Sequence, residues 1–307
     1  MSAGNRIGLT LGPLLYLWDQ PAWSDFYNRI ADEADVDTVV LGEIVCSKRD
    51  HFHAGAIERI AERLTAAGKR VRLGSPALVT IEREAKTVRQ LAARSDYELE
   101  AGELSAHAAM GGRPHAVGPL VNVYNAPTAR VLAARGAVSI CLPPELPLAS
   151  VRSIIAGAPE IAFEVFAFGK VPLAISARCA HARNKGLVKD NCQFVCGADP
   201  DGLPVDTLDG QHFLALNGVQ TMSSTCQSLI TDVPALADAG VRSFRLSPQV
   251  CDMVRVAGLF RSVLDGRIQP EEAYSRLSEC YPTASFSNGF LHAAPGHRFV
   301  GDRFSAP

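Results

Sequence analysis

The sequence predicts an α/β fold, a TIM-barrel-like (β/α) barrel that tolerates irregularity and carries one long cysteine-bearing loop. Short β-rich runs recur along the 307 residues, and helix-like segments separate most of them. Strands and helices that alternate at roughly twenty to thirty residues are typical of βα units on a parallel sheet. About eight such units indicate a closed barrel. An open doubly wound sheet is the alternative, but no G-x-G-x-x-G motif follows the first run to support it.

The expected strands are short and rich in Val, Ile, Leu and Ala. Strands that are covered by protein on both faces have this composition. The runs are 6–12, 37–42, 70–75, 97–102, 115–124, 137–142, 161–169, 212–217 and 241–247.

The helix-like segments have apolar periodicity and recognisable ends. AGAIERIAERLTAAGK places Ile57, Ile60 and Leu64 on one face, and Gly68 follows where a left-handed cap costs little. PTARVLAARG begins with Pro127 in the favoured first turn and ends at Gly136. The other segments are 24–34, 82–95, 225–240, which Pro234 interrupts, and 251–266.

The chain is expected to form a single barrel-like domain over residues 1–307. Its length would also allow two ordinary domains, but no low-complexity tract, tandem repeat or Ser/Gly linker marks a border. The one long irregular stretch, residues 176–211, contains three cysteines. Because loops of that length inside a compact domain are usually functional or disordered, we expect a functional insertion there.

Charge and hydropathy limit the partners and the cellular location that the sequence predicts. A formal net charge of −2 gives no global basic field, so nucleic acid is not expected as a bulk electrostatic partner. The apolar run 7–18 leads to Asp19, Gln20 and Pro21 and not to a cleavage site, which predicts a strand and not a signal peptide. No charge-free stretch is long enough to span a membrane. We therefore expect a reducing, cytoplasmic location, where clustered cysteines bind metals or serve redox chemistry.

Three cysteines in the polar stretch 176–196 carry the strongest chemical signal. Cys179, Cys192 and Cys196 follow the pattern Cys-x12-Cys-x3-Cys. Mononuclear zinc sites are usually built from closely spaced pairs, which are missing here. A cubane iron–sulfur cluster accepts wider spacing because each thiolate binds a different iron, and it requires a fourth cysteine.

Cys46, just after the second expected strand, is the best candidate for the fourth ligand. Loops that leave the carboxyl ends of barrel strands gather at one end, so Cys46 and the 176–196 stretch can meet. Four thiolates around a 4Fe–4S cluster leave negative charge, which nearby cations such as Lys48, Arg49 and Arg178 could offset. These charges could equally be solvated loop residues, and zinc stays open as the alternative metal.

The other chemical signals are weaker. Cys141, Cys226, Cys251 and Cys280 are expected to be buried structural residues, with Cys226 and Cys251 on helical segments. Glu43, Glu100 and Glu164 are candidates for site acids or for pairing at the edge of the core. His51 and His53 form an H-x-H pair that either binds a metal or begins a helix. H-E-x-x-H, G-x-S-x-G and Walker-type motifs are absent from the sequence.

Several phrases together resemble the UbiU/UbiV branch of the collagenase-like peptidases, family U32. They are GEIVCSKR, PLAISARC with the two following cysteines, LNGVQTMS, FRLSPQ, LGPLLYLW and NVYNAPTARVL. The resemblance runs from about residue 6 to about residue 303, and the cysteine phrases are its most specific part. No motif in the chain supports the peptidase name.

The resemblance implies a TIM-barrel-like protein with an oxygen-sensitive 4Fe–4S cluster on Cys46, Cys179, Cys192 and Cys196. It further implies a heterodimer with a UbiU paralogue that hydroxylates ubiquinone precursors without dioxygen, with a lipid-carrier protein as a further candidate partner. Related members are thought to take oxygen from prephenate. If this chain does so, the carboxylates of prephenate would need cationic partners, for which Lys48, Arg49 and Arg178 are candidates.

Two alternatives to a catalytic subunit stay open. One is a non-catalytic, cluster-bearing scaffold that stabilises the paralogue. The other is a zinc-site hydrolase on the same barrel. The sequence does not separate them, because no clear acid/base pair stands out.

Overall fold

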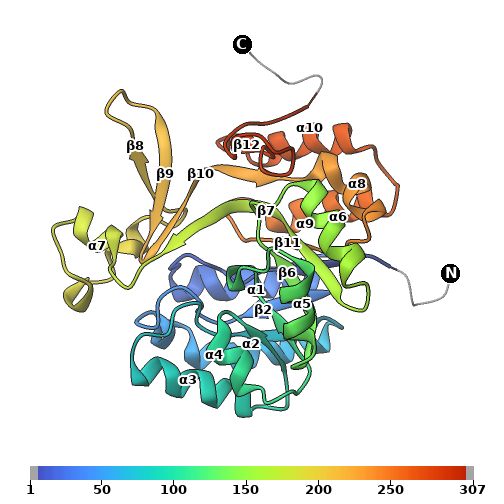
Figure 1. The fold of residues 1–307 in the computed structure, drawn as a ribbon. Coiled ribbons are helices and arrows are strands. Elements are labelled where there is room, and N and C mark those ends of the chain that lie inside the picture. Colours follow the sequence, from blue (N-terminus) through green and yellow to red (C-terminus); the bar gives the residue numbers. More distant parts are fainter. Residues whose placement is uncertain (1–5, 302–307) are drawn as a thin grey trace.

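The computed structural model describes residues 6–301 and contains a closed barrel of eight parallel strands surrounded by helices (Figure 1). The barrel order is β11, β1, β2, β3, β4, β5, β6, β7, and β7 pairs with β11 to close the ring. The predicted TIM-barrel-like fold class is therefore confirmed. The strands are β1 (Gly8–Leu11), β2 (Thr38–Leu41), β3 (Arg70–Gly74), β4 (Glu98–Ala101), β5 (His115–Val117), β6 (Ala137–Leu142), β7 (Ala162–Ile175) and β11 (Ser243–Leu246).

Helices cover the outside of the barrel, and their ends follow local chemistry. The carboxylate of Asp19 accepts a hydrogen bond from the Ala22 amide at 2.8 Å and caps the first of them. Gly68 and Gly136 have positive φ angles of 81° and 100°, as a left-handed ending requires. The helices are α1 (Gln20–Glu33), α2 (Ala54–Ala66), α3 (Glu82–Ala93), α4 (Leu104–Ala109), α5 (Ala126–Ala133), α6 (Leu148–Gly157), α8 (Val233–Asp238), α9 (Met253–Leu264) and α10 (Pro270–Cys280).

An arm projects from the barrel on the side of Figure 1 that carries α7 (Ala180–Asn184). It consists of the end of β7 with β10 (Gln220–Ser228), β9 (His212–Asn217) and β8 (Leu203–Asp206), all paired antiparallel. The short β12 (Phe286–Ser287) pairs with β10. Most of the stretch 176–211 lies in this arm.

Two sequence predictions were wrong in this region. Residues 212–217 form a strand, but it belongs to the arm and not to the barrel. The segment 225–240 was predicted as a helix that Pro234 interrupts, whereas it continues β10 to Ser228 and becomes helical only at Ile230, in a short 3-10 helix before α8. Pairing of Cys226 and Gln227 with β7 is a long-range contact that overrides the local helical pattern.

The barrel interior is held together by buried ion pairs. The Arg245 guanidinium donates two hydrogen bonds to Glu100, at 2.8 and 2.5 Å, and one to Glu164 at 2.5 Å. The three side chains are 2–4% exposed. Burial alone would raise the pKa of Glu164, but Arg245 and Arg72 hold it below the ordinary value, so the carboxylate is charged. Glu100 and Glu164 are thus pairing groups of the core.

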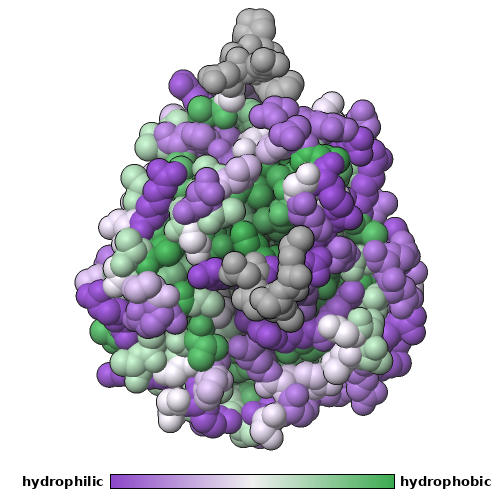
Figure 2. Space-filling view, turned by 90° about the vertical axis from the view of Figure 1, so that its right-hand side faces the viewer, coloured by the Kyte–Doolittle hydropathy of each residue, from purple (hydrophilic) through white to green (hydrophobic). Residues whose placement is uncertain are grey.

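No helix within residues 6–301 combines the length and apolar composition that crossing a bilayer requires. The face on the N-terminal side mixes polar residues with hydrophobic ones (Figure 2). Scattered exposure of this kind is normal for a folded protein surface.

Replacement of Arg245 by Ala should destabilise the fold strongly, because it leaves two buried carboxylates without their partner. We expect the free energy of unfolding, measured with urea, to fall by about 3–5 kcal/mol. Arg255→Ala is the control, since Arg255 makes only an exposed 3.4 Å ion pair with Glu279 and should cost less than about 1 kcal/mol. Similar losses in both variants would contradict the role of the ion-pair network.

Candidate metal centre

The four cysteines of interest lie on two loops at the carboxyl end of the barrel. Cys46 follows β2, and the other three follow β7. Cys179 precedes α7, Cys192 follows the short helix η3 (Lys189–Asn191), and Cys196 lies in η4 (Val195–Ala198). Because parallel strands end at the same edge, the barrel brings both loops to one place.

All four cysteines line one small cavity. Its other lining residues come from the same two loops and from the turn between β9 and β10; they are Lys48, Arg49, Lys189, Phe194, Val195 and Gly218. The thiol of Cys179 is close enough to those of Cys46 and Cys192 for their charges to affect its pKa, and Cys196 is affected in the same way by Cys179 and Cys192. The four thiols are free, with no disulfide among them.

The arrangement of the thiols differs from that of a site for a single ion. Within the part of the chain that the structure describes, no three His, Cys, Asp or Glu side chains are grouped closely enough to hold one metal ion. Structural zinc requires such a group at about 2.3 Å from each sulfur. A cubane, in contrast, presents four irons at separate corners and holds its thiolates further apart. The four cysteines line one cavity, but they are not grouped as a site for a single ion.

A buried arginine supplies positive charge to this cavity. Arg49 is 1% exposed, and its guanidinium donates to the Leu15 carbonyl and to the Asn217 side-chain oxygen, both at 2.9 Å. Its Nε–H has no hydrogen-bond partner, and the Cys196 thiol is close enough to the guanidinium group to raise its pKa. A buried donor without an acceptor is costly. An anionic sulfur group in the cavity would satisfy this donor.

Burial and the Arg49 charge act in opposite directions on the thiols. Burial raises the pKa of Cys196 above the ordinary thiol value, and Arg49 lowers it in part. Burial likewise raises the pKa of Cys46, which Arg49 also opposes. As free thiols these groups are protonated at neutral pH, and metal binding would have to displace the protons.

Lys48 joins the two loops. Its ammonium group donates to the carbonyls of Lys189 at 2.8 Å and of Asp190 at 2.9 Å. These bonds fix the Cys46 loop against the loop that leads to Cys192. Lys48 therefore adds positive charge to the rim of the cavity and also holds it in shape.

The residues that line the cysteine cavity all lie within the part of the chain that matches a known protein family. The model of a family described as Peptidase family U32 matches residues 23–300. The chain belongs to peptidase family U32. The predicted family is confirmed, and within this U32 protein both cysteine loops lie inside the matched range.

Solved structures of similar architecture have very different sequences. N-acetylneuraminate lyase from Mycoplasma synoviae is 8% identical, with 98% of this chain and 92% of that chain covered and a TM-score of 0.46. Dihydrodipicolinate synthase from Aquifex aeolicus is 9% identical, with 89% and 80% covered and a TM-score of 0.41. Similarities at this level carry no information about activity.

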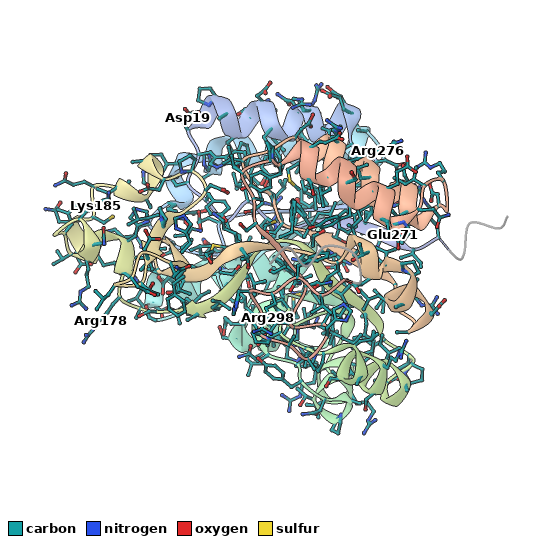
Figure 3. The ribbon with its side chains drawn as sticks, turned by 90° about the horizontal axis from the view of Figure 1, so that it is seen from above. Asp19, Arg178, Lys185, Glu271, Arg276 and Arg298 are labelled. Carbon is teal, nitrogen blue, oxygen red and sulfur yellow. The ribbon has the colours of Figure 1, made fainter. Side chains whose placement is uncertain are left out.

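Arg178, a third candidate from the sequence, lies away from the cavity. It is exposed on the outer part of the arm, where its side chain points away from the barrel (Figure 3). Of the three cations named as candidates for substrate binding, only Lys48 and Arg49 line the cysteine cavity. Arg49 has little capacity left for a substrate, because it is buried and two of its nitrogens already donate to protein oxygens.

The loop between Cys192 and Cys196 contains strain that the sequence did not reveal. Gln193 and Phe194 have φ angles of 48° and 52°, in the left-handed region that non-glycine residues avoid. This conformation directs Phe194 against Phe52, with the ring centres 4.8 Å apart. Strain of about 1–3 kcal/mol per residue persists only where the surroundings enforce it, often at functional sites.

The remaining cysteines and the histidine pair lie outside the cavity. Cys226 is in β10 and not in a helix, and Cys251 precedes α9, so the predicted helical placement was wrong for both. Neither these two nor Cys141 and Cys280 line the cavity. His53 stacks on Trp23, with ring centres 4.8 Å apart, and does not join the cysteines.

Gly218 provides a test of how closely Arg49 is packed. A Cβ atom at Gly218 would lie 2.5 Å from a terminal nitrogen of Arg49 and would displace it. We expect Gly218→Ala to lower the free energy of unfolding by about 1–3 kcal/mol more than Gly210→Ala. Gly210 is the matched control because its φ is also positive, at 80°, but a Cβ there meets nothing within 4 Å. Equal losses in urea unfolding would contradict the close packing of Arg49.

Proposed function

We propose that this U32 protein is a UbiV-like iron–sulfur subunit of an oxygen-independent hydroxylase that acts on ubiquinone precursors. The observation that supports the proposal most directly is the convergence of four cysteines from two distant loops on one cavity with a buried arginine. In this proposal Cys46, Cys179, Cys192 and Cys196 hold a 4Fe–4S cluster. The stretch 176–211 is then the cluster-binding insertion of a single barrel domain.

The residues around the cavity have distinct roles in this proposal. Four cysteine ligands fill every protein-facing position of a cubane, so the bound cluster would supply electron transfer and not direct ligation of a substrate. Arg49 offsets the negative charge of the thiolates, and its Nε–H donates to sulfur. Lys48 keeps the two loops in register through the carbonyls of Lys189 and Asp190.

The proposed complex has a second subunit and small-molecule partners. A UbiU paralogue would form the heterodimer, and a lipid-carrier protein could deliver the ring substrate. Prephenate is the proposed oxygen donor. Its carboxylates would require cations other than Arg49, because the Arg49 guanidinium is occupied by protein acceptors.

The non-catalytic scaffold is a second candidate function. Glu100 and Glu164, two carboxylates inside the barrel, are both occupied by Arg245. General acid/base catalysis requires a group that can reach the substrate proton. A subunit that carries a cluster without performing the hydroxylation itself agrees with this arrangement.

Metal analysis after purification without air tests the cluster. We expect a brown protein with ~4 iron and ~4 sulfide per chain. Cys192→Ala should lose the cluster, because it removes one of four ligands. Cys280→Ala is the matched control: its thiol is also partly buried but contacts the Asp252 carbonyl, and the iron content should be unchanged.

Two outcomes of that analysis would refute the assignment. A colourless protein with one zinc per chain would establish a mononuclear site. Equal loss of iron from Cys192→Ala and Cys280→Ala would show that the four chosen cysteines are not a distinct set.

Hydroxylation by the reconstituted heterodimer separates the catalytic subunit from the scaffold. The Cys192→Ala chain is combined with a cluster-loaded paralogue, and ring hydroxylation is followed without dioxygen. If electrons pass through this subunit, we expect turnover to fall by at least about a hundredfold, comparable to the loss of an essential group. Hydroxylation at the wild-type rate would establish the scaffold role.

A further inference from the structure

A large cavity opens at the amino end of the barrel, opposite the cysteines. Its volume is about 840 Å³, which lies within the range of small-molecule sites. The first residues of most barrel strands line it, including Gly8, Thr38, Ala162 and Ser243. The site is therefore separate from the cysteine cavity, which lies beyond the other ends of these strands.

Small side chains are the reason that the cavity exists. A barrel interior is usually filled by layers of bulky branched side chains. Here six of the lining positions on the barrel strands carry glycine, serine, threonine or alanine: Gly8, Thr10, Thr38, Ser139, Ala162 and Ser243. These residues leave space at the barrel axis, and several of them contribute hydroxyl groups to its wall.

The floor of the cavity is polar and charged. Thr10 donates to Glu164 at 2.5 Å and lies 3.0 Å from the Ser243 hydroxyl. Arg72, 5% exposed, donates to Glu98 at 2.6 Å. The floor therefore holds fixed polar groups that can orient a ligand.

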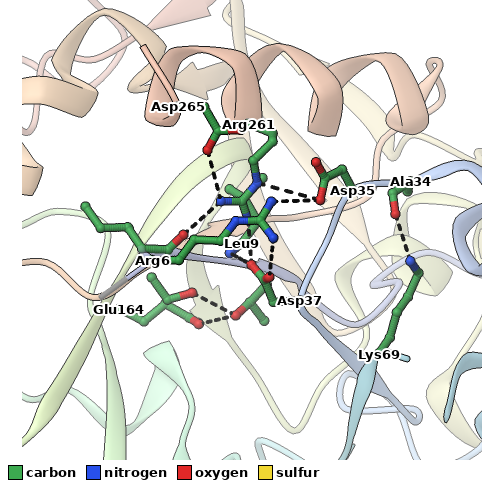
Figure 4. A network of polar contacts seen from close by, with 12 residues as sticks. Arg6, Leu9, Ala34, Asp35, Asp37, Lys69, Glu164, Arg261 and Asp265 are labelled. Atoms are coloured by element: carbon green, nitrogen blue, oxygen red, sulfur yellow. Dashed lines mark hydrogen bonds and ion pairs between the residues drawn. The ribbon is translucent and has the colours of Figure 1, made fainter. Parts of the chain in front are cut away.

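Positive charge dominates the lining. Five cationic side chains, Arg6, Lys69, Arg70, Arg72 and Arg242, line the cavity with three carboxylates, those of Asp37, Glu98 and Glu164. Figure 4 shows part of this network, in which Arg6 and Arg261 meet Asp37. The carboxylates are thus compensated by their neighbours, and the lining retains an excess of cations.

Two of these cations have no partner. The guanidinium groups of Arg70 and Arg242 form neither a hydrogen bond nor an ion pair with any residue in the range 6–301, and both are exposed at the mouth. A guanidinium fork binds the oxygens of phosphate and carboxylate groups in a bidentate manner. Two unpaired guanidinium groups at the opening of one cavity match a ligand group with two negative charges.

We propose that this amino-end cavity binds a small phosphate monoester with a hydroxylated body. Arg70 and Arg242 bind the phosphate at the mouth, and the hydroxyl side chains of Thr38, Ser139 and Ser243 contact the body of the ligand. The volume is too large for an inorganic ion alone, which is the reason to assign an organic phosphate. The site is independent of the proposed iron–sulfur function.

Isothermal titration of the full-length chain, purified without air, tests the site at constant ionic strength. The probes are ribose 5-phosphate, inorganic phosphate and succinate, with sodium chloride as the reference. We expect ribose 5-phosphate to bind more tightly than inorganic phosphate, and succinate more weakly than either. Arg70→Gln combined with Arg242→Gln should weaken ribose 5-phosphate binding by at least about tenfold.

Two further variants make the test specific. Arg152→Gln, which removes an exposed and unpaired arginine that does not line the cavity, should leave binding unchanged. Arg70→Lys combined with Arg242→Lys keeps the charge without the fork and should bind with intermediate affinity. Because all of these side chains are exposed, circular dichroism should confirm that each variant is folded.

Three outcomes would overturn the proposal. The first is the absence of heat from ribose 5-phosphate at millimolar concentration. The second is undiminished binding by the double Gln variant. The third is binding of succinate but not of the phosphates, which would assign the cavity to dicarboxylates. None of these results bears on the iron content of the chain, so this site and the cluster succeed or fail separately.

Discussion

The structure depends on one strand, β7, that belongs to both the barrel and the arm. The first half of β7 pairs in parallel with β6 and β11 and closes the barrel, and its second half pairs antiparallel with β10 in the arm. Continuous strand pairing is stiff, so the position of the arm relative to the barrel is fixed by backbone hydrogen bonds. Three of the four clustered cysteines follow this strand, whereas Cys46 follows β2. Closure of the barrel and alignment of the thiols are therefore consequences of the same pairing.

The sequence was sufficient for the architecture where local and long-range signals agree. Gly68 and Gly136 end helices as their positions predicted, and the βα alternation gave the correct barrel. The sequence-based prediction was wrong at 225–240, where apolar periodicity indicated a helix. The first residues of that segment pair instead with β7, about sixty residues earlier in the chain. Strand pairing depends on distant residues, so a local pattern cannot reveal it.

The candidate site, too, was only partly predictable from the sequence. The spacing of cysteines and the geometry of a barrel were enough to expect Cys46 beside the other three. The environment of the thiols could not be predicted from the sequence. Arg49 is held by hydrogen bonds to Leu15 and Asn217, which are 34 and 168 positions away in the chain. From the sequence, Arg49 could offset the charge of the thiolates, be a solvated loop residue or meet a substrate. Its burial assigns it to the thiols, since a buried guanidinium with two protein acceptors has little freedom to bind another molecule.

Ion pairs extend from the middle of the barrel interior to its amino end. Toward the middle, the side chains of Arg245, Glu100 and Glu164 are 2–4% exposed, whereas that of Glu98 at the amino end is 21% exposed. Buried ion pairs lose hydration, and this loss is smaller where one partner still contacts solvent. The open cavity thus lets the outer Arg72–Glu98 pair keep part of its hydration, and this pair in turn places a second arginine near Glu164. Filling the amino end with branched side chains would remove that hydration, so the charged core and the open cavity depend on each other.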